Sequence, residues 1–143
     1  MTIDFDLDRF IDAQNEIYDK ALRELQAGRK RSHWMWFIFP QIAGLGSSFM
    51  AEKYAIRSIE EAGAFLADPI LGPRLHRCVD AVLATKEQSA HDIFGSPDDL
   101  KLRSSMTLFA AISDHDSAFH KVIEKFYDGA FDTRTIELLD ARS

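Results

Sequence analysis

The segment Ser32–Ser48 reads SHWMWFIFPQIAGLGSS and is the most aromatic part of the chain. Two Trp and two Phe fall between His33 and Pro40. A continuous apolar run of this length is compatible with either a buried strand or a short buried helix. Pro40 prevents an uninterrupted helix and favours an extended conformation for Phe39 before it. We therefore expect a short helical turn, followed by an extended segment and a loop that ends near Ser47.

The flanking sequence has helical periodicity and helix-boundary residues. Residues 4–27 repeat apolar side chains at steps of three and four, and Gly28 is a suitable stop. Start signals occur at Ser58 with Glu61, at Asp68-Pro69, at Ser89 with Asp92, and at Ser96-Pro97. Further helices are expected over 48–55, 97–113, from Asp114 or Asp116 to Gly129, and over 133–141. The sequence predicts an all-α fold, a single compact domain over 1–143 with about six to eight helices and no significant sheet.

Composition limits the classes of partner. The net charge of -6 argues against generic nucleic-acid binding, and we read the short basic run Arg29–Arg31 as a solvated helix end. Cys78 is the only cysteine, so an internal disulfide is excluded, and its apolar neighbours predict a buried thiol. No signal peptide, membrane span or cofactor fingerprint is recognised, so we expect a cytoplasmic protein without a cofactor.

The helix expected over 97–113 places polar residues on its apolar face. At 100° per residue, Asp98, Lys101 and Ser105 fall in one stripe with Leu102 and Phe109. One interpretation is a local Asp98–Lys101 pair in an exposed first turn, with Ser105 bonded to the preceding turn. The other is a polar pocket lined by this face, in which Lys101 carries the charge and Ser105 donates a hydrogen bond.

The aromatic segment allows two interpretations as well. Trp34 and Trp36 are either core residues or the apolar walls of a pocket whose polar tips include His33 and Gln41. The Gly44–Ser48 stretch is either a plain loop or a set of backbone N–H groups that receives an anion. Metal binding is not predicted, because His115 and His120 would diverge by roughly 140° on one helix.

Several motifs together resemble a known family. They are Ser32–Gln41, Gly44–Ser47, Tyr54–Ile56, Asp68-Pro69, Leu71-Gly72, Arg74-Leu75, Ile93–Gly95 and Asp98–Phe109. In these motifs the chain is similar to a family of uncharacterised bacterial and fungal proteins whose members are often labelled calpastatin-like. The resemblance implies a compact all-helical domain and transfers no catalytic residue. The calpain inhibitor of that name is disordered and repetitive, so we do not carry its function over.

We hypothesise a small-molecule site, for a nucleotide or another phosphorylated metabolite, between residues 32–48 and the helix start at 97–109. His33 and Asp98 are the candidate proton-transfer groups. The candidate ligand-binding residues are Trp34, Trp36, Gln41, Gly44, Gly46, Ser47, Lys101 and Ser105. The alternative is a non-catalytic protein-interaction or homodimerisation module that uses the Trp/Phe segment as its surface, with Arg29–Arg31 on its rim.

Overall fold

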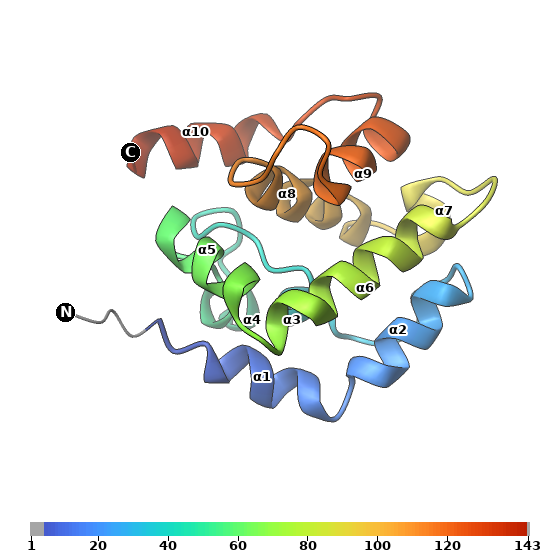
Figure 1. Cartoon of the computed structure of the whole chain (residues 1–143), viewed down its shortest axis with the longest axis horizontal. Helices are drawn as coiled ribbons and strands as arrows, with labels where there is room; N and C mark the ends of the chain where they lie inside the picture. The colour runs from blue at the N-terminus through green and yellow to red at the C-terminus, as the bar shows by residue number, and fades with distance from the viewer. Residues whose placement is uncertain (1–4, 143) are drawn as a thin grey trace.

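The computed structural model describes residues 5–142, and within them it contains helices and no strand. Figure 1 shows how these helices are arranged. The ten helices of this range are α1 (Asp8–Asn15), α2 (Tyr18–Gln26), α3 (Met35–Ile38), α4 (Phe49–Lys53), α5 (Ile59–Ala67), α6 (Leu71–Ala84), α7 (Ala90–Phe94), α8 (Asp98–Ala110), α9 (Ala118–Tyr127) and α10 (Thr133–Arg142). The all-α prediction is confirmed, and the expected number of helices was too low.

The predicted helix over 4–27 is divided into α1 and α2. The Ile17 N–H bonds the Gln14 carbonyl at 3.0 Å, which is a tighter turn than an α-helix makes. Buried Gln14 also donates its side-chain amide to the Phe37 carbonyl at 2.7 Å. As a result α1 packs on α3 while α2 packs on α6, and the bend between them is visible in Figure 1. Asp4, which we expected near the start of this helix, lies outside the described residues.

Most helix starts follow their sequence signals. The hydroxyls of Ser48, Ser58 and Ser89 accept a backbone N–H at the starts of α4, α5 and α7. Three starts differ from the prediction, and one of them is that of α6, which begins at Leu71, two residues after Pro69. α8 begins at Asp98 without a side-chain cap from Ser96, and α9 begins at Ala118, after the cap residue Ser117.

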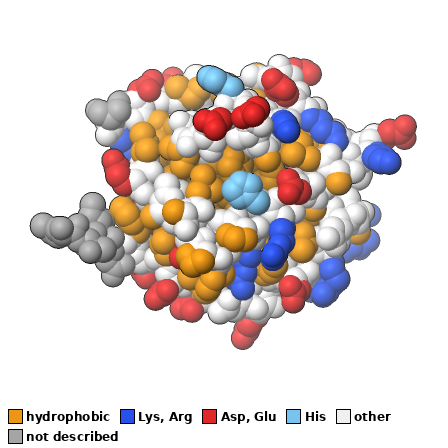
Figure 2. All heavy atoms as spheres, in the orientation of Figure 1, with side chains coloured by type: hydrophobic (Ala, Val, Ile, Leu, Met, Phe, Trp, Pro, Cys, Tyr) orange, Lys and Arg blue, Asp and Glu red, His pale blue; other side chains and the backbone are white. Residues whose placement is uncertain are grey.

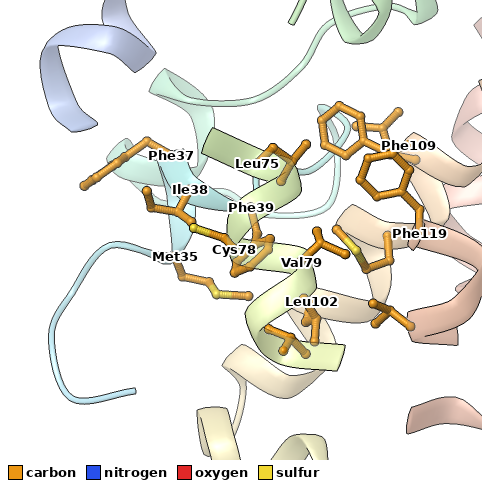
Figure 3. Packing of buried hydrophobic residues seen from close by; sticks show 14 of the residues in the cluster. Met35, Phe37, Ile38, Phe39, Leu75, Cys78, Val79, Leu102, Phe109 and Phe119 are labelled. Atoms are coloured by element: carbon orange, nitrogen blue, oxygen red, sulfur yellow. The ribbon is translucent and has the colours of Figure 1, made fainter. Parts of the chain in front are cut away.

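The core lies around α6. Figure 3 shows Leu75, Cys78 and Val79 of α6 between the α3 segment and the rings of Phe109 and Phe119. All three residues are at least 98% buried, and burial raises the pKa of the Cys78 thiol to about 12. The prediction of a buried thiol is therefore confirmed, and the raised pKa keeps this thiol protonated and a poor nucleophile at neutral pH.

The loop that follows α3 is fastened to distant parts of the chain. The Ala43 N–H donates to the Ile56 carbonyl at 2.8 Å, and the Ile56 N–H donates to the Gln41 carbonyl at 2.8 Å. Arg142 of α10 donates to the Ala43 carbonyl at 2.9 Å. These bonds hold the Gln41–Gly46 loop between the α4–α5 connection and the last helix.

Among the described residues, no helix combines the length and the apolar character needed to cross a lipid bilayer. On the face that Figure 2 shows, acidic side chains lie along the outline and at a few places inside it, and most basic side chains lie toward the right. Hydrophobic side chains gather near the middle of this face and are interrupted by polar groups.

Candidate functional site

The two segments that we expected to share a site are neighbours in the structure. The Lys101 Nζ lies 5.3 Å from the centre of the Trp36 ring. The Lys30 Nζ lies 5.0 Å from the Trp34 ring and forms an ion pair with Asp98 Oδ2 at 2.8 Å. The start of α8 therefore packs beside the aromatic stretch, although some 60 residues separate the two in sequence.

A groove of about 440 Å³ opens where this pair of segments meets α10. Its walls are the Gln41–Ser48 loop with the adjacent turn of α4, the first two turns of α8, and the start of α10. We call it the Lys101 groove. Its polar lining includes Gln41, Gly46, Ser47, Lys101, Asp132 and Arg134. Four of these six residues were predicted ligand-binding residues.

The loop side of the groove presents backbone donors. The N–H groups of Gly46, Ser47 and Ser48 donate no hydrogen bond to any group of residues 5–142. A Cβ on Gly46 would lie 2.8 Å from the Ala51 Cβ, so the loop lies directly against α4. Gly44 adopts a φ of +107°, which favours glycine, and it lines a neighbouring hollow and not this groove.

Positive charge exceeds available negative charge in the groove. Among the described residues the lining holds two cations, Lys101 and Arg134, and one carboxylate, Asp132, whose Oδ2 accepts hydrogen bonds from the Thr135 N–H at 2.9 Å and the Thr135 hydroxyl at 2.5 Å. Lys101 lies 3.7 Å from Asp98, whose closer partner is Lys30. Arg134 has only an exposed contact with Glu137 at 3.5 Å, and such pairs are weak. Both cations can therefore attract an anion.

Two predicted ligand-binding residues belong to the core instead. Trp34 is fully buried, and its indole N–H donates to Glu24 Oε1 at 2.9 Å. Ser105 is also fully buried, and within the described chain its Oγ has no hydrogen-bond partner, so the predicted bond to the preceding turn is not formed. Neither lines the Lys101 groove. The sequence pattern placed both on apolar faces, where a core position and a pocket wall look alike.

The alternative hypothesis requires the Trp/Phe segment to form an exposed interaction surface, and most of this segment is buried. Trp34, Phe37 and Phe39 are buried, and Trp36 is partly covered by Lys101. The segment therefore presents no continuous aromatic face to a protein partner or a second copy of the chain, contrary to what the alternative hypothesis requires.

The predicted proton-transfer groups are not brought together in the groove. His33 is exposed and makes no hydrogen bond, ion pair or ring contact with residues 5–142. Asp98 is held between Lys30 and Lys101. Neither residue lines the groove, and the geometry assigns them no joint role.

His115 and His120 form a second polar cluster, contrary to the prediction that they diverge. His115 precedes α9, so the helical geometry does not apply to it, and the two ring centres lie 5.6 Å apart. The rings line a hollow of about 560 Å³ that has no Lys or Arg in its lining. The His120 Nδ1 is occupied by the Ser117 hydroxyl at 2.8 Å. Within the described chain, no three His, Cys, Asp or Glu residues are grouped to hold a metal ion.

Sequence reasoning missed Asp132 and Arg134 at the start of α10 and Lys30 beside Asp98. An Asp or Arg near a helix start has many structural explanations, and no local pattern connects residue 134 with residue 101. A weak indication existed for Lys30, which lies in the basic run immediately before the aromatic segment.

Comparison of the sequence with models of protein families assigns the chain to a family. Residues 4–139 match the model of the family described as "Protein of unknown function (DUF1810)", and the chain belongs to that family. The resemblance inferred from the sequence motifs is thereby confirmed at the level of an uncharacterised family.

A solved structure agrees with this assignment. The chain is similar to the crystal structure of the conserved hypothetical protein Rv1873 from Mycobacterium tuberculosis, with 53% identity and a TM-score of 0.93. The similarity covers 95% of this chain and 97% of that one. No curated protein matches the sequence.

Proposed function

We propose that the Lys101 groove binds a small molecule that carries a phosphate group. The observation that carries this proposal is that Lys101, Arg134 and the Gly46–Ser48 segment line one hollow, and that the N–H groups of this segment have no partner within residues 5–142. Phosphate is recognised in proteins by cationic side chains together with backbone N–H groups. A volume of about 440 Å³ is within the range of small-molecule sites.

The proposal concerns binding and assigns no reaction. His33 and Asp98 lie outside the lining of the groove, and no nucleophile in it is activated by a neighbouring base. Ser104 lines the groove but donates its hydroxyl to the Leu100 carbonyl at 3.2 Å. Gln41 is the lining residue best suited to orient a neutral part of the ligand, because its amide offers both a donor and an acceptor.

The test compares the Lys101→Ala variant with the parent protein in a thermal-shift screen of phosphorylated metabolites and nucleotides. A ligand at about 100 times its Kd stabilises the folded state by about 2.7 kcal/mol, which raises the Tm of a domain of this size by several degrees. We expect this rise for the parent and its loss in Lys101→Ala. Without ligand, the variant should melt close to the parent, because the contacts it loses are partly exposed.

Lys121→Ala is the matched control, since Lys121 is an exposed lysine of α9 and does not line the groove. It should keep the full ligand-induced rise in Tm. A screen in which no phosphorylated compound stabilises the parent would contradict the proposal, and so would an unchanged response of Lys101→Ala.

A further inference from the structure

A second hollow adjoins the Lys101 groove on the other side of the Gln41–Gly46 loop. It has a volume of about 360 Å³, and its charged lining residues are Glu52 and Arg57; we call it the Arg57 hollow. The two spaces share Gln41, Leu45, Gly46 and Ala51 as lining residues. Gly46 has no side chain, so at this residue only backbone, packed against Ala51, forms the ridge between the spaces. One small molecule can therefore extend from one space into the other.

The lining of both spaces argues against a nucleobase. No aromatic side chain lines the groove or the hollow among the described residues. Trp34 is buried, and Lys101 lies over Trp36. Proteins that bind a base usually stack it on an aromatic ring or an Arg plane. The exposed Arg57 guanidinium shares the lining of the hollow with the Glu52 carboxylate, and Arg134 in the groove is one of the cations assigned to the phosphate. The nucleotide that the sequence suggested is therefore the less suitable ligand.

The charged groups of the Arg57 hollow suit hydroxyl groups. The Glu52 carboxylate and the Arg57 guanidinium make no side-chain hydrogen bond or ion pair within residues 5–142. A carboxylate only accepts hydrogen bonds and a guanidinium only donates them, whereas a hydroxyl does both. A molecule with several neighbouring hydroxyls can therefore satisfy Glu52, Arg57 and the Gln41 amide together.

We infer that the ligand is a sugar phosphate that spans the two spaces. Its phosphate lies in the Lys101 groove beside Lys101 and Arg134, and its hydroxyl-bearing part crosses the Gly46 ridge to Glu52 and Arg57. This inference rests on the proposed function, because it identifies the class of ligand that the same site binds.

Isothermal titration of the whole protein tests it with four probes: inorganic phosphate, ribose 5-phosphate, glucose 6-phosphate and AMP. We expect at least one of the two sugar phosphates to bind about tenfold more tightly than inorganic phosphate. A tenfold difference in Kd is the gain expected from one additional charge-assisted hydrogen bond. AMP should bind no more tightly than ribose 5-phosphate. Glu52→Gln and Arg57→Ala should each remove most of the sugar increment, by which we mean the gain in affinity of a sugar phosphate over inorganic phosphate. Both variants should leave the affinity for inorganic phosphate unchanged. Lys101→Ala should weaken the binding of all four probes.

The matched controls are Glu60→Gln and Arg77→Ala. They replace exposed residues that line neither space, so both variants should preserve every affinity.

The inference would be overturned, with the proposed function left intact, if inorganic phosphate and both sugar phosphates bound equally well. An unchanged sugar increment in Glu52→Gln and Arg57→Ala would have the same consequence. Tighter binding of AMP than of both sugar phosphates would overturn it as well. If none of the four probes binds the parent protein, the inference is overturned, and the thermal-shift screen of phosphorylated compounds decides the proposed function. Glu52→Gln retains the shape of the side chain, so it carries the test even if Arg57→Ala fails to fold.

Discussion

At the scale of single residues, buried Glu24 organises the turn that precedes the aromatic segment. Its carboxylate accepts the backbone N–H groups of Arg31 at 2.8 Å and Ser32 at 2.9 Å. It also accepts the Ser32 hydroxyl at 2.6 Å and the Trp34 indole at 2.9 Å. Burial on its own raises the pKa of this carboxyl, but the four hydrogen bonds outweigh it and lower the pKa to about 2. An ionised Glu24 therefore fixes Trp34 in the core.

Glu24→Gln should destabilise the protein at neutral pH. Lowering a pKa from its ordinary value of about 4.3 to about 2 corresponds to ~3 kcal/mol of folding free energy. The unfolded chain takes up the proton first as the pH falls below about 4.3, so this stabilisation is complete above that value and is lost toward pH 2. Urea unfolding should therefore give a difference of about 2–3 kcal/mol between parent and variant at pH 7, and a smaller difference at pH 3.

Glu16→Gln is the control for this prediction, because Glu16 is exposed at the end of α1. Its free energy of unfolding should stay within about 0.5 kcal/mol of the parent value. A Glu24→Gln deficit that is equally large at pH 7 and pH 3 would show that the carboxylate charge does not hold this turn.

At the scale of elements, the junction of α5 and α6 depends on one glycine. A Cβ on Gly72 would lie 2.1 Å from the backbone carbonyl oxygen of Leu66, which cannot move without displacing the end of α5. Gly63, inside α5, has no atom within 4 Å of its hypothetical Cβ. The space around these two helical glycines is therefore very different.

Alanine substitutions at these positions should change stability in opposite directions. Gly72→Ala should lower the free energy of unfolding by about 1–3 kcal/mol, the usual cost of overpacking. Gly63→Ala should raise it by about 0.5–1 kcal/mol, because alanine is the better helix former. Chemical denaturation of both variants measures the two changes. A stable Gly72→Ala protein would mean that α5 and α6 do not approach this closely.

The helix starts show which helix boundaries can be predicted from neighbouring residues alone. Ser58 and Ser89 cap helices as expected, because a cap needs only a hydroxyl and a backbone N–H a few residues away. The break between α1 and α2 was missed because it depends on Gln14 bonding the Phe37 carbonyl, a contact between residues far apart in sequence. Glu61 departs from its expected cap geometry for a similar reason. Its carboxylate accepts the Arg57 N–H and also pairs with Arg9.

At the scale of the whole molecule, the sequence identified the two segments that meet but not the complete lining of the site. Gln41 and Lys101 line the groove as expected. The neighbouring sequence is enough to predict that Gln41 is a polar loop residue and on which side of its helix Lys101 lies. Arg134 and Arg57 were not found, because their place in the site follows only from how α10 and the α4–α5 connection are packed. Trp34 was misassigned because periodicity does not distinguish a core aromatic from a pocket wall.

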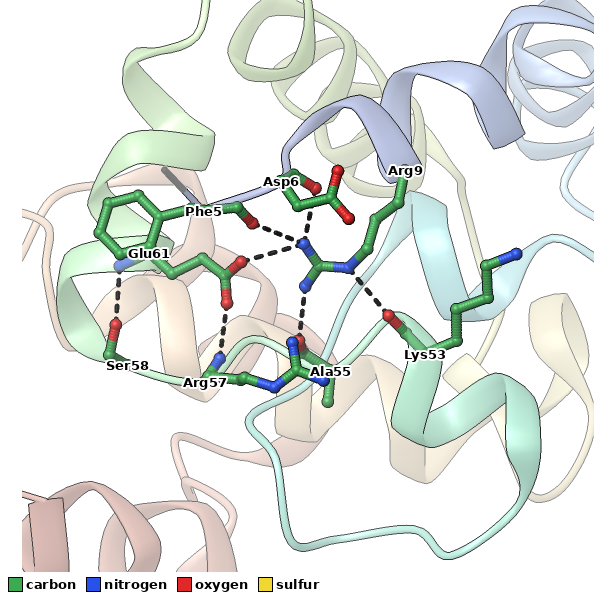
Figure 4. Close-up of polar contacts among 8 residues, drawn as sticks. All are labelled: Phe5, Asp6, Arg9, Lys53, Ala55, Arg57, Ser58 and Glu61. Carbon is green, nitrogen blue, oxygen red and sulfur yellow. Dashed lines mark hydrogen bonds and ion pairs between the residues drawn. The ribbon is translucent and has the colours of Figure 1, made fainter. Parts of the chain in front are cut away.

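Arg9 connects the N-terminal segment to the α4–α5 connection, which forms one wall of the Arg57 hollow. Figure 4 shows its guanidinium among the carbonyls of Phe5, Asp6, Lys53 and Ala55, with an ion pair to Glu61 at 3.1 Å. The two charged side chains are only 8% and 3% exposed. Removing one of them leaves the other charge buried without its partner, which is the costly case for an ion pair.

A double-mutant cycle should therefore show strong coupling between Arg9 and Glu61. Arg9→Met should cost about 3–5 kcal/mol, since Glu61 keeps only the Arg57 N–H while the carbonyls of Phe5, Lys53 and Ala55 lose their donor. Glu61→Gln should cost about 1–3 kcal/mol. The double variant should lose less free energy of unfolding than the sum of the two single variants, by about 1–3 kcal/mol, as measured by urea unfolding.

The control cycle uses Arg134 and Glu137, each 60% exposed, for which we expect coupling below about 0.5 kcal/mol. If the two cycles give equal coupling, Arg9 and Glu61 are as well solvated as the surface pair, and the N-terminal segment does not fasten the wall of the Arg57 hollow.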